Sequence, residues 1–134
     1  LRILTPGQSV AVYIKNIIPD RMKIKLLGVP EEILEKYTAV SLETAEAMAV
    51  GLRNESQAEL CISITGIAGP SGGTESQPVG TVYAGVLYRD RLCVTNLMLW
   101  DVCPSERQEI RHAAAACAFG IALRMLMEDE ECRK

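Results

Sequence analysis

A glycine-rich stretch at residues 65–74 lies between two apolar runs, residues 60–64 and 79–87. The stretch contains four glycines: Gly66, Gly69, Gly72 and Gly73. Glycine tolerates positive φ and has no Cβ, so successive N–H groups can converge on a phosphate, a carboxylate or an oxyanion. The pattern predicts two strands joined by a loop, which is either an anion site or a glycine-rich connection with no ligand.

Strand and helix signals alternate before this loop. Residues 10–18 are rich in β-branched side chains and predict a strand, whereas a helix is expected from Pro19 to Leu27, ended by Gly28. A short helix is expected over residues 30–36, and Ser41 is a candidate N-cap for a longer one. The inward face of that longer helix is expected to carry Leu42, Ala45, Met48, Ala49 and Leu52.

The segments after the loop predict a hairpin and a final helix. Residues 79–88 and 92–100 read as strands joined by a turn at residues 89–91, short enough for antiparallel pairing. Ser105 and Gln108 have the spacing of a capping box. The core stripe of the following helix is expected to be Ile110, Ala114, Cys117, Ile121 and Met125.

These elements predict an α/β fold in which helices cover a mixed sheet. At 134 residues and 49% hydrophobic, the chain is expected to form one domain, residues 1–134. We find no apolar run near the roughly 20 residues of a membrane span, so we expect a soluble protein with no membrane partner. The net charge of −3 and the lack of a basic stripe argue against nucleic acid as a partner.

Cysteine and histidine usage limits the chemistry. The five cysteines, one of them Cys103, include no C-x-x-C pair, which predicts reduced thiols in a cytoplasm and no metal site. Cysteines within apolar runs are expected to be buried, and His112 is the only histidine, which disfavours histidine-based catalysis. No dinucleotide fingerprint follows a first strand, so no cofactor is expected.

Several further segments carry a more specific pattern than the loop alone. They are Gln77-Pro78-Val79-Gly80-Thr81-Val82-Tyr83, Leu26-Leu27-Gly28-Val29-Pro30, Ala39-Val40-Ser41 and the pair Arg107 and Arg111. Together with residues 65–74 they resemble one family, the C-terminal domain of competence/damage-inducible protein CinA, which also occurs alone as nicotinamide mononucleotide deamidase. The resemblance extends from about Pro6 to the end of the chain.

The resemblance implies a three-layer α/β/α sandwich around a mixed sheet of about five strands, and a homo-oligomer. The implied reaction converts nicotinamide mononucleotide to nicotinic acid mononucleotide and ammonia, with a serine nucleophile activated by a lysine that aligns with Lys23. A lysine can act as a base where burial lowers its pKa. A mononucleotide or another phosphorylated ligand would be bound by Thr65, Gly66, Ile67, Ala68, Gly69, Gly72, Gly73, Arg107 and Arg111.

The sequence departs from the family around this lysine. The family's tyrosine, serine and asparagine positions hold Ile18, Pro19 and Asp20. The family's Glu-Ser-Cys-Thr-Gly-Gly nucleophile segment would lie before Leu1 and is not among these residues. We therefore expect an impaired or inactive amidohydrolase, with a non-catalytic nucleotide- or phosphate-binding module and an oligomerising interaction protein as alternatives.

Overall fold

The computed structural model describes the chain except for residues 1, 6–7, 13–19, 102–105 and 134. Its elements are β1 (Arg2–Thr5), β2 (Gln8–Val12), α1 (Asp20–Leu27), α2 (Glu31–Tyr37), α3 (Leu42–Ser56), β3 (Leu60–Gly66), β4 (Val82–Tyr88), β5 (Arg91–Asn96), the 3-10 helix η1 (Leu99–Asp101) and α4 (Arg107–Cys132). This order confirms the α/β class.

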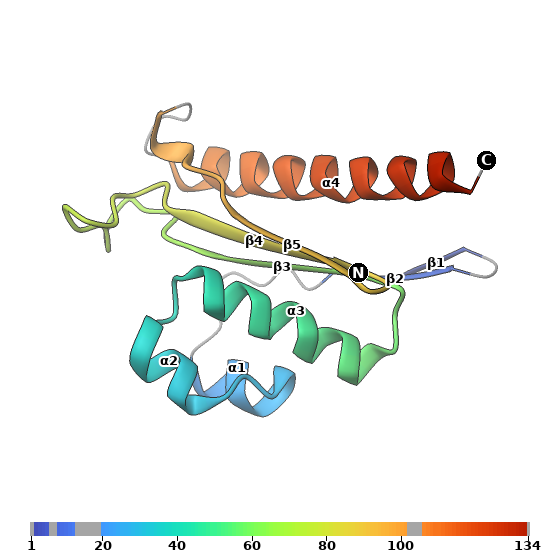
Figure 1. The fold of residues 1–134 in the computed structure, drawn as a ribbon. Coiled ribbons are helices and arrows are strands. Elements are labelled where there is room, and N and C mark those ends of the chain that lie inside the picture. Colours follow the sequence, from blue (N-terminus) through green and yellow to red (C-terminus); the bar gives the residue numbers. More distant parts are fainter. Residues whose placement is uncertain (1, 6–7, 13–19, 102–105, 134) are drawn as a thin grey trace.

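The strands join in the order β1-β2-β3-β4-β5. Only the β2–β3 ladder is parallel among the described pairs; β1–β2, β3–β4 and β4–β5 are antiparallel. Helix packing is concentrated on β3, β4 and β5, and the β1–β2 ribbon extends from that part of the sheet (Figure 1). The expectation of about five strands is therefore met only in part, because the portion packed by helices is three strands wide.

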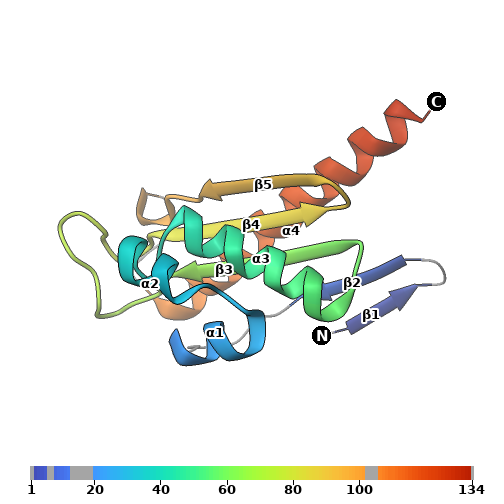
Figure 2. The same ribbon diagram turned by 60° about the horizontal axis from the view of Figure 1, so that its bottom comes forward.

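Helices lie on both faces of the sheet: α4 on one, and α1, α2 and α3 on the other (Figures 1 and 2). The alternation of side chains along β3 explains this arrangement. Leu60 and Ile62 pack in a cluster with Ala118 and Ala122 of α4. The intervening Cys61 packs with residues of α1 and α3. Because alternate residues of a strand face opposite sides, Thr65 is directed to the same face as Cys61.

The predicted end of α1 and start of α3 are confirmed, whereas Pro19, the expected start of the first helix, lies outside the described residues. Gly28 follows α1 with φ +60° and so ends the helix in a conformation that glycine adopts readily. Ser41 is the N-cap of α3, where its side chain accepts a hydrogen bond from the Thr44 amide. The predicted inward stripe of α3 is buried except at Leu42, which is 42% exposed.

The two strands after the loop are shorter than predicted. Residues 13–18 of the strand expected at residues 10–18 lie outside the described residues, and β2 covers Gln8–Val12. The antiparallel β4–β5 hairpin is confirmed, but β4 begins at Val82, after Gly80 with φ +97°. The second strand ends at Asn96, and Trp100 lies in η1 rather than in a strand.

The predicted stripe of α4 is wrong in its middle. Ile110, Ala114 and Met125 are buried, but Ala118 and Ala122 take the central core positions and Cys117 is exposed. Small residues lie on several sides of α4 there, so the apolar pattern does not show which side of the helix faces the core. Ser105 lies outside the described residues, and the N-cap Glu106 makes no side-chain capping hydrogen bond.

Helix α4 also corrects the expectation about apolar length. Among the described helices it alone is long and apolar enough to cross a bilayer, with 26 residues and a mean hydropathy of 1.3 over the tested window. A core helix passes the same test, and α4 packs one side on the sheet. Its other side exposes Phe119, Leu123 and Met127 at 48%, 59% and 54%.

Candidate functional site

Lys23 is a buried lysine on the α1 face of the sheet. Its side chain is 7% exposed, and its Nζ donates to the Ala39 carbonyl at 3.1 Å and lies 3.5 Å from Oδ1 of Asp20. Burial lowers the pKa of Lys23 below its usual value, and the Asp20 carboxylate acts in the opposite direction. Lys23 is therefore not a solvated surface lysine, although a lysine at the start of a helix ordinarily is one.

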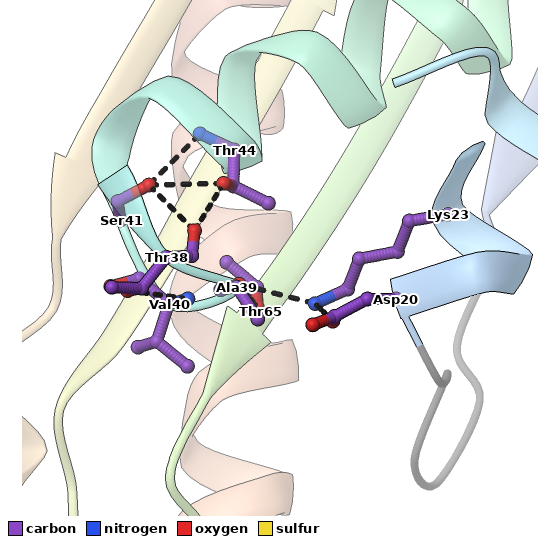
Figure 3. A network of polar contacts seen from close by, with 8 residues as sticks. All are labelled: Asp20, Lys23, Thr38, Ala39, Val40, Ser41, Thr44 and Thr65. Atoms are coloured by element: carbon purple, nitrogen blue, oxygen red, sulfur yellow. Dashed lines mark hydrogen bonds and ion pairs between the residues drawn. The ribbon is translucent and has the colours of Figure 1, made fainter. Parts of the chain in front are cut away.

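The Ala39 carbonyl joins Lys23 to the end of β3. Thr65 is buried there, and its Oγ1 donates to the same carbonyl at 2.6 Å. Figure 3 shows Lys23 and Thr65 approaching the carbonyl from two different elements. This shared acceptor places the lysine beside the first residue of the glycine-rich loop.

The segment that carries Ala39 is fixed from both sides. The Thr38 carbonyl accepts from Oγ1 of Thr44 at 2.6 Å and from Oγ of Ser41 at 3.3 Å, so the start of α3 holds it (Figure 3). Thr38 itself has φ 70°, a conformation that is uncommon for a residue with a Cβ. These hydroxyl contacts offset the cost of that backbone turn and aim the Ala39 carbonyl at Lys23.

The glycine-rich loop is closed at its base and attached to the same segment. Ile67 and Thr81 share a backbone hydrogen bond of 2.8 Å, as do Gly80 and Ile67. Farther out, Nε2 of Gln77 donates to the Val40 carbonyl at 3.0 Å. The loop is therefore anchored next to the carbonyl that Lys23 contacts.

The middle of the loop keeps unused donors. Within the part of the chain that the structure describes, no hydrogen bond is made by the backbone N–H groups of Ala68, Gly69, Ser71, Gly72 and Gly73. Gly69 and Gly72 have φ 77° and 94°, and residues 70–76 are exposed. The Ile67 amide is used in the ladder, so the hypothesis of an anion site applies to the other loop amides.

The two predicted arginines have different surroundings. Nη1 of Arg107, in the first turn of α4, donates to the Gly69 carbonyl at 3.0 Å. Nη1 of Arg111 lies 3.3 Å from Oε1 of Gln108 on its own helix. Arg107 is thus brought to the loop, whereas the contact of Arg111 is local to α4.

No metal centre is seen within the described ranges, where no three histidine, cysteine, aspartate or glutamate residues lie close enough to hold an ion. Among the described cysteines, Cys61 is buried, Cys93 is partly buried, and Cys117 and Cys132 are exposed. The burial expected of cysteines in apolar runs thus holds fully only for Cys61.

Sequence reasoning missed two members of this arrangement, the Ala39 carbonyl and the Gln77 side chain. Ala39 and Lys23 are 16 residues apart, and Val40 and Gln77 are 37 apart. No local spacing links such pairs. Both residues lie in segments that resemble the family, and this resemblance is the sequence signal that pointed to them.

The fold and these contacts define an α/β domain in which a buried lysine lies beside an anchored glycine-rich loop. The family model described as the CinA C-terminal domain matches residues 7–126. The chain therefore belongs to the CinA family. A CinA-like protein of Kosmotoga olearia is 41% identical over 118 residues, which are 87% of this chain and 28% of that protein. The chain spans only about a quarter of such a relative.

Solved structures of related proteins have the same fold. A CinA superfamily protein from Enterobacter cloacae aligns with a TM-score of 0.74 at 28% identity, over 82% of this chain and 63% of that one. The competence/damage inducible protein CihA from Agrobacterium tumefaciens aligns with a TM-score of 0.69 at 35% identity, over 79% and 64%. Their α/β architecture agrees with the one described above.

Proposed function

We propose that this domain binds a pyridine mononucleotide, with nicotinamide mononucleotide as the family's substrate, at the site formed by Lys23, Thr65 and the glycine-rich loop. The burial of Lys23 beside that loop is the observation that carries the proposal. A lysine with its pKa lowered by desolvation is suited to accept a proton from a hydroxyl nucleophile.

In this proposal the loop amides of Ala68, Gly69, Gly72 and Gly73 bind the phosphate or the oxyanion. Their N–H groups are unpaired in the described part of the chain, and each donor aimed at an oxyanion contributes on the order of 3 kcal/mol to its stabilisation. Arg107 adds positive charge near Gly69. We assign Arg111 a weaker, longer-range role because its contact is with its own helix.

The proposed reaction is hydrolysis of the carboxamide. A hydroxyl attacks the amide carbon while Lys23 takes its proton, ammonia leaves with a proton, and water then releases the carboxylate. Among the described residues, the hydrogen-bond partners of Lys23 are a carboxylate and a carbonyl, not a hydroxyl. We therefore propose that these 134 residues bind the nucleotide but hydrolyse it slowly or not at all.

The test is titration of the purified chain with nicotinamide mononucleotide by calorimetry, with ammonia release measured in parallel. We expect binding that Lys23→Met weakens and that Lys25→Met leaves unchanged, since Lys25 is exposed on the same helix. Absence of heat together with absence of ammonia would refute the proposal. Binding with slow ammonia release would support an impaired amidohydrolase, whereas binding with no ammonia release would support the second candidate, a non-catalytic nucleotide-binding module.

That second candidate has its own support in the Lys23–Asp20 contact, because a lysine paired with a carboxylate keeps its proton more readily. We also propose that the domain has the family's three-layer sandwich with about five strands, that it forms homo-oligomers and that it is cytoplasmic. The exposed apolar residues of α4 support self-association, which light scattering would test. The described cysteines are all free, which suits a reducing compartment.

A further inference from the structure

Asp20 and Lys23 form an unequal pair at the start of α1. Asp20 is the first residue of the helix and Lys23 lies one turn later, which brings carboxylate and ammonium to 3.5 Å. The side chain of Lys23 is 7% exposed, whereas that of Asp20 is 59% exposed. One partner is therefore fixed inside the domain while the other is open to solvent, salt and ligand.

The other described groups that join Lys23 to the domain are uncharged hydrogen-bonding groups. The segment between α2 and α3 contributes the Ala39 carbonyl, and β3 contributes Thr65, whose hydroxyl donates to that carbonyl. On α3, the buried hydroxyl of Thr44 donates to Thr38. Among the residues that the structure describes, Asp20 is the one whose charged side chain forms an ion pair with Lys23.

We propose that Asp20 is a positioning residue that holds Lys23 in its ammonium form, directed at the Ala39 carbonyl, and thereby adapts the site to bind an anion rather than to abstract a proton. The inference rests on the proposed function, since it describes how the same lysine is controlled. Burial alone favours the neutral amine, and the carboxylate opposes burial. Removing the carboxylate leaves burial unopposed.

The test measures the protonation of Lys23 directly, without any nucleotide. Trace acetylation with acetic anhydride is followed against pH by mass spectrometry, with the exposed Lys25 and Lys36 as internal references. In Asp20→Asn the midpoint of Lys23 labelling moves to lower pH. At pH values below the midpoint, the rate of Lys23 labelling, divided by its own high-pH plateau, should be about two- to fivefold higher in Asp20→Asn than in wild type. This is the range that an ion pair with an exposed partner contributes.

Two matched variants control for charge and for helix position. Asp20→Glu keeps the carboxylate and should restore the wild-type curve. Glu31→Gln removes an exposed carboxylate from the first turn of α2 and should leave Lys23 unchanged. An unchanged midpoint in Asp20→Asn, or an equal shift in Glu31→Gln, would overturn the proposal.

Salt provides a second measurement that needs no folded variant. In the wild-type chain, 1 M salt should screen the exposed carboxylate and lower the midpoint of Lys23 labelling. A midpoint that does not respond to salt would contradict the proposal even if Asp20→Asn fails to fold. The proposed function would fail in a different experiment, the nucleotide titration, because labelling reports only on the protonation of Lys23.

Discussion

Replacing Gly51 with alanine tests how α1, and with it Lys23, is held on α3. A Cβ at Gly51 would collide with the carbonyl oxygen of Leu27 and lie 2.7 Å from its carbonyl carbon and 3.2 Å from its Cα. These are backbone atoms at the end of α1, so no side-chain rotation relieves the overlap. The helix itself must move, and it carries Lys23 four residues before Leu27.

The size of the effect follows from two opposing terms. Alanine in place of glycine inside a helix favours folding by about 1 kcal/mol. Overpacking against fixed neighbours costs about 1–3 kcal/mol, and a backbone collision belongs at the upper end of that range. We therefore expect Gly51→Ala to lower the free energy of unfolding by about 1–2 kcal/mol.

Gly120→Ala is the matched control, because Gly120 also lies within a helix, α4, but a Cβ there meets nothing within 4 Å. Only the helix-propensity gain remains, so Gly120→Ala should raise the free energy of unfolding by about 1 kcal/mol. Urea denaturation followed by circular dichroism measures both variants. If Gly51→Ala stabilises the chain as much as Gly120→Ala does, the close packing of α1 on α3 is refuted.

Three further predictions follow from other contacts. Lys23→Met should be more stable than wild type, because the variant does not bury a charged lysine. The lowered pKa of Lys23 means that the folded chain binds this proton less tightly than the unfolded chain does. The difference in stability between Lys23→Met and wild type should therefore narrow as the pH rises toward 10.5, the pKa of the lysine in the unfolded chain. Thermal melts across pH measure this difference, and a difference that widens with pH would contradict a lowered pKa. Gln77→Leu removes the 3.0 Å bond to Val40 and should speed proteolysis of the loop about fivefold, whereas unchanged cleavage means that the bond does not anchor it. Asp129→Asn should lower the free energy of unfolding by about 1 kcal/mol, because Asp129 accepts from Tyr88 and from two arginines; urea denaturation showing no loss would count against that clamp.

The sequence predicted best the features that depend on neighbours along the chain. Gly28 ends α1 and Ser41 begins α3, since a helix end is decided by one or two residues. The β4–β5 hairpin was predictable because its turn is short. Which residues of α4 face the core was not predictable, because an alanine-rich helix is apolar on several sides. Packing against the sheet buries Ala118 and leaves Cys117 exposed.

The candidate site was predictable in its parts but not in its connections. The glycines predicted a loop whose backbone amides can bind an anion, and the resemblance pointed to Lys23. Its burial could not be read from the sequence, since a lysine at the start of a helix is ordinarily solvated. What buries it is α1 lying on α3 together with a carbonyl 16 residues away, and such contacts exist only once the chain has folded.

Three consecutive carbonyls explain how these connections form one site. The Thr38 carbonyl is held by α3, the Ala39 carbonyl by Lys23 and Thr65, and the Val40 carbonyl by Gln77 of the loop. Adjacent peptide planes share a Cα atom, so a displacement of one of these carbonyls shifts its neighbours unless φ and ψ compensate. The position of the loop and that of Lys23 are therefore set by the same short segment, so a ligand that orders the loop acts on backbone that also positions the lysine.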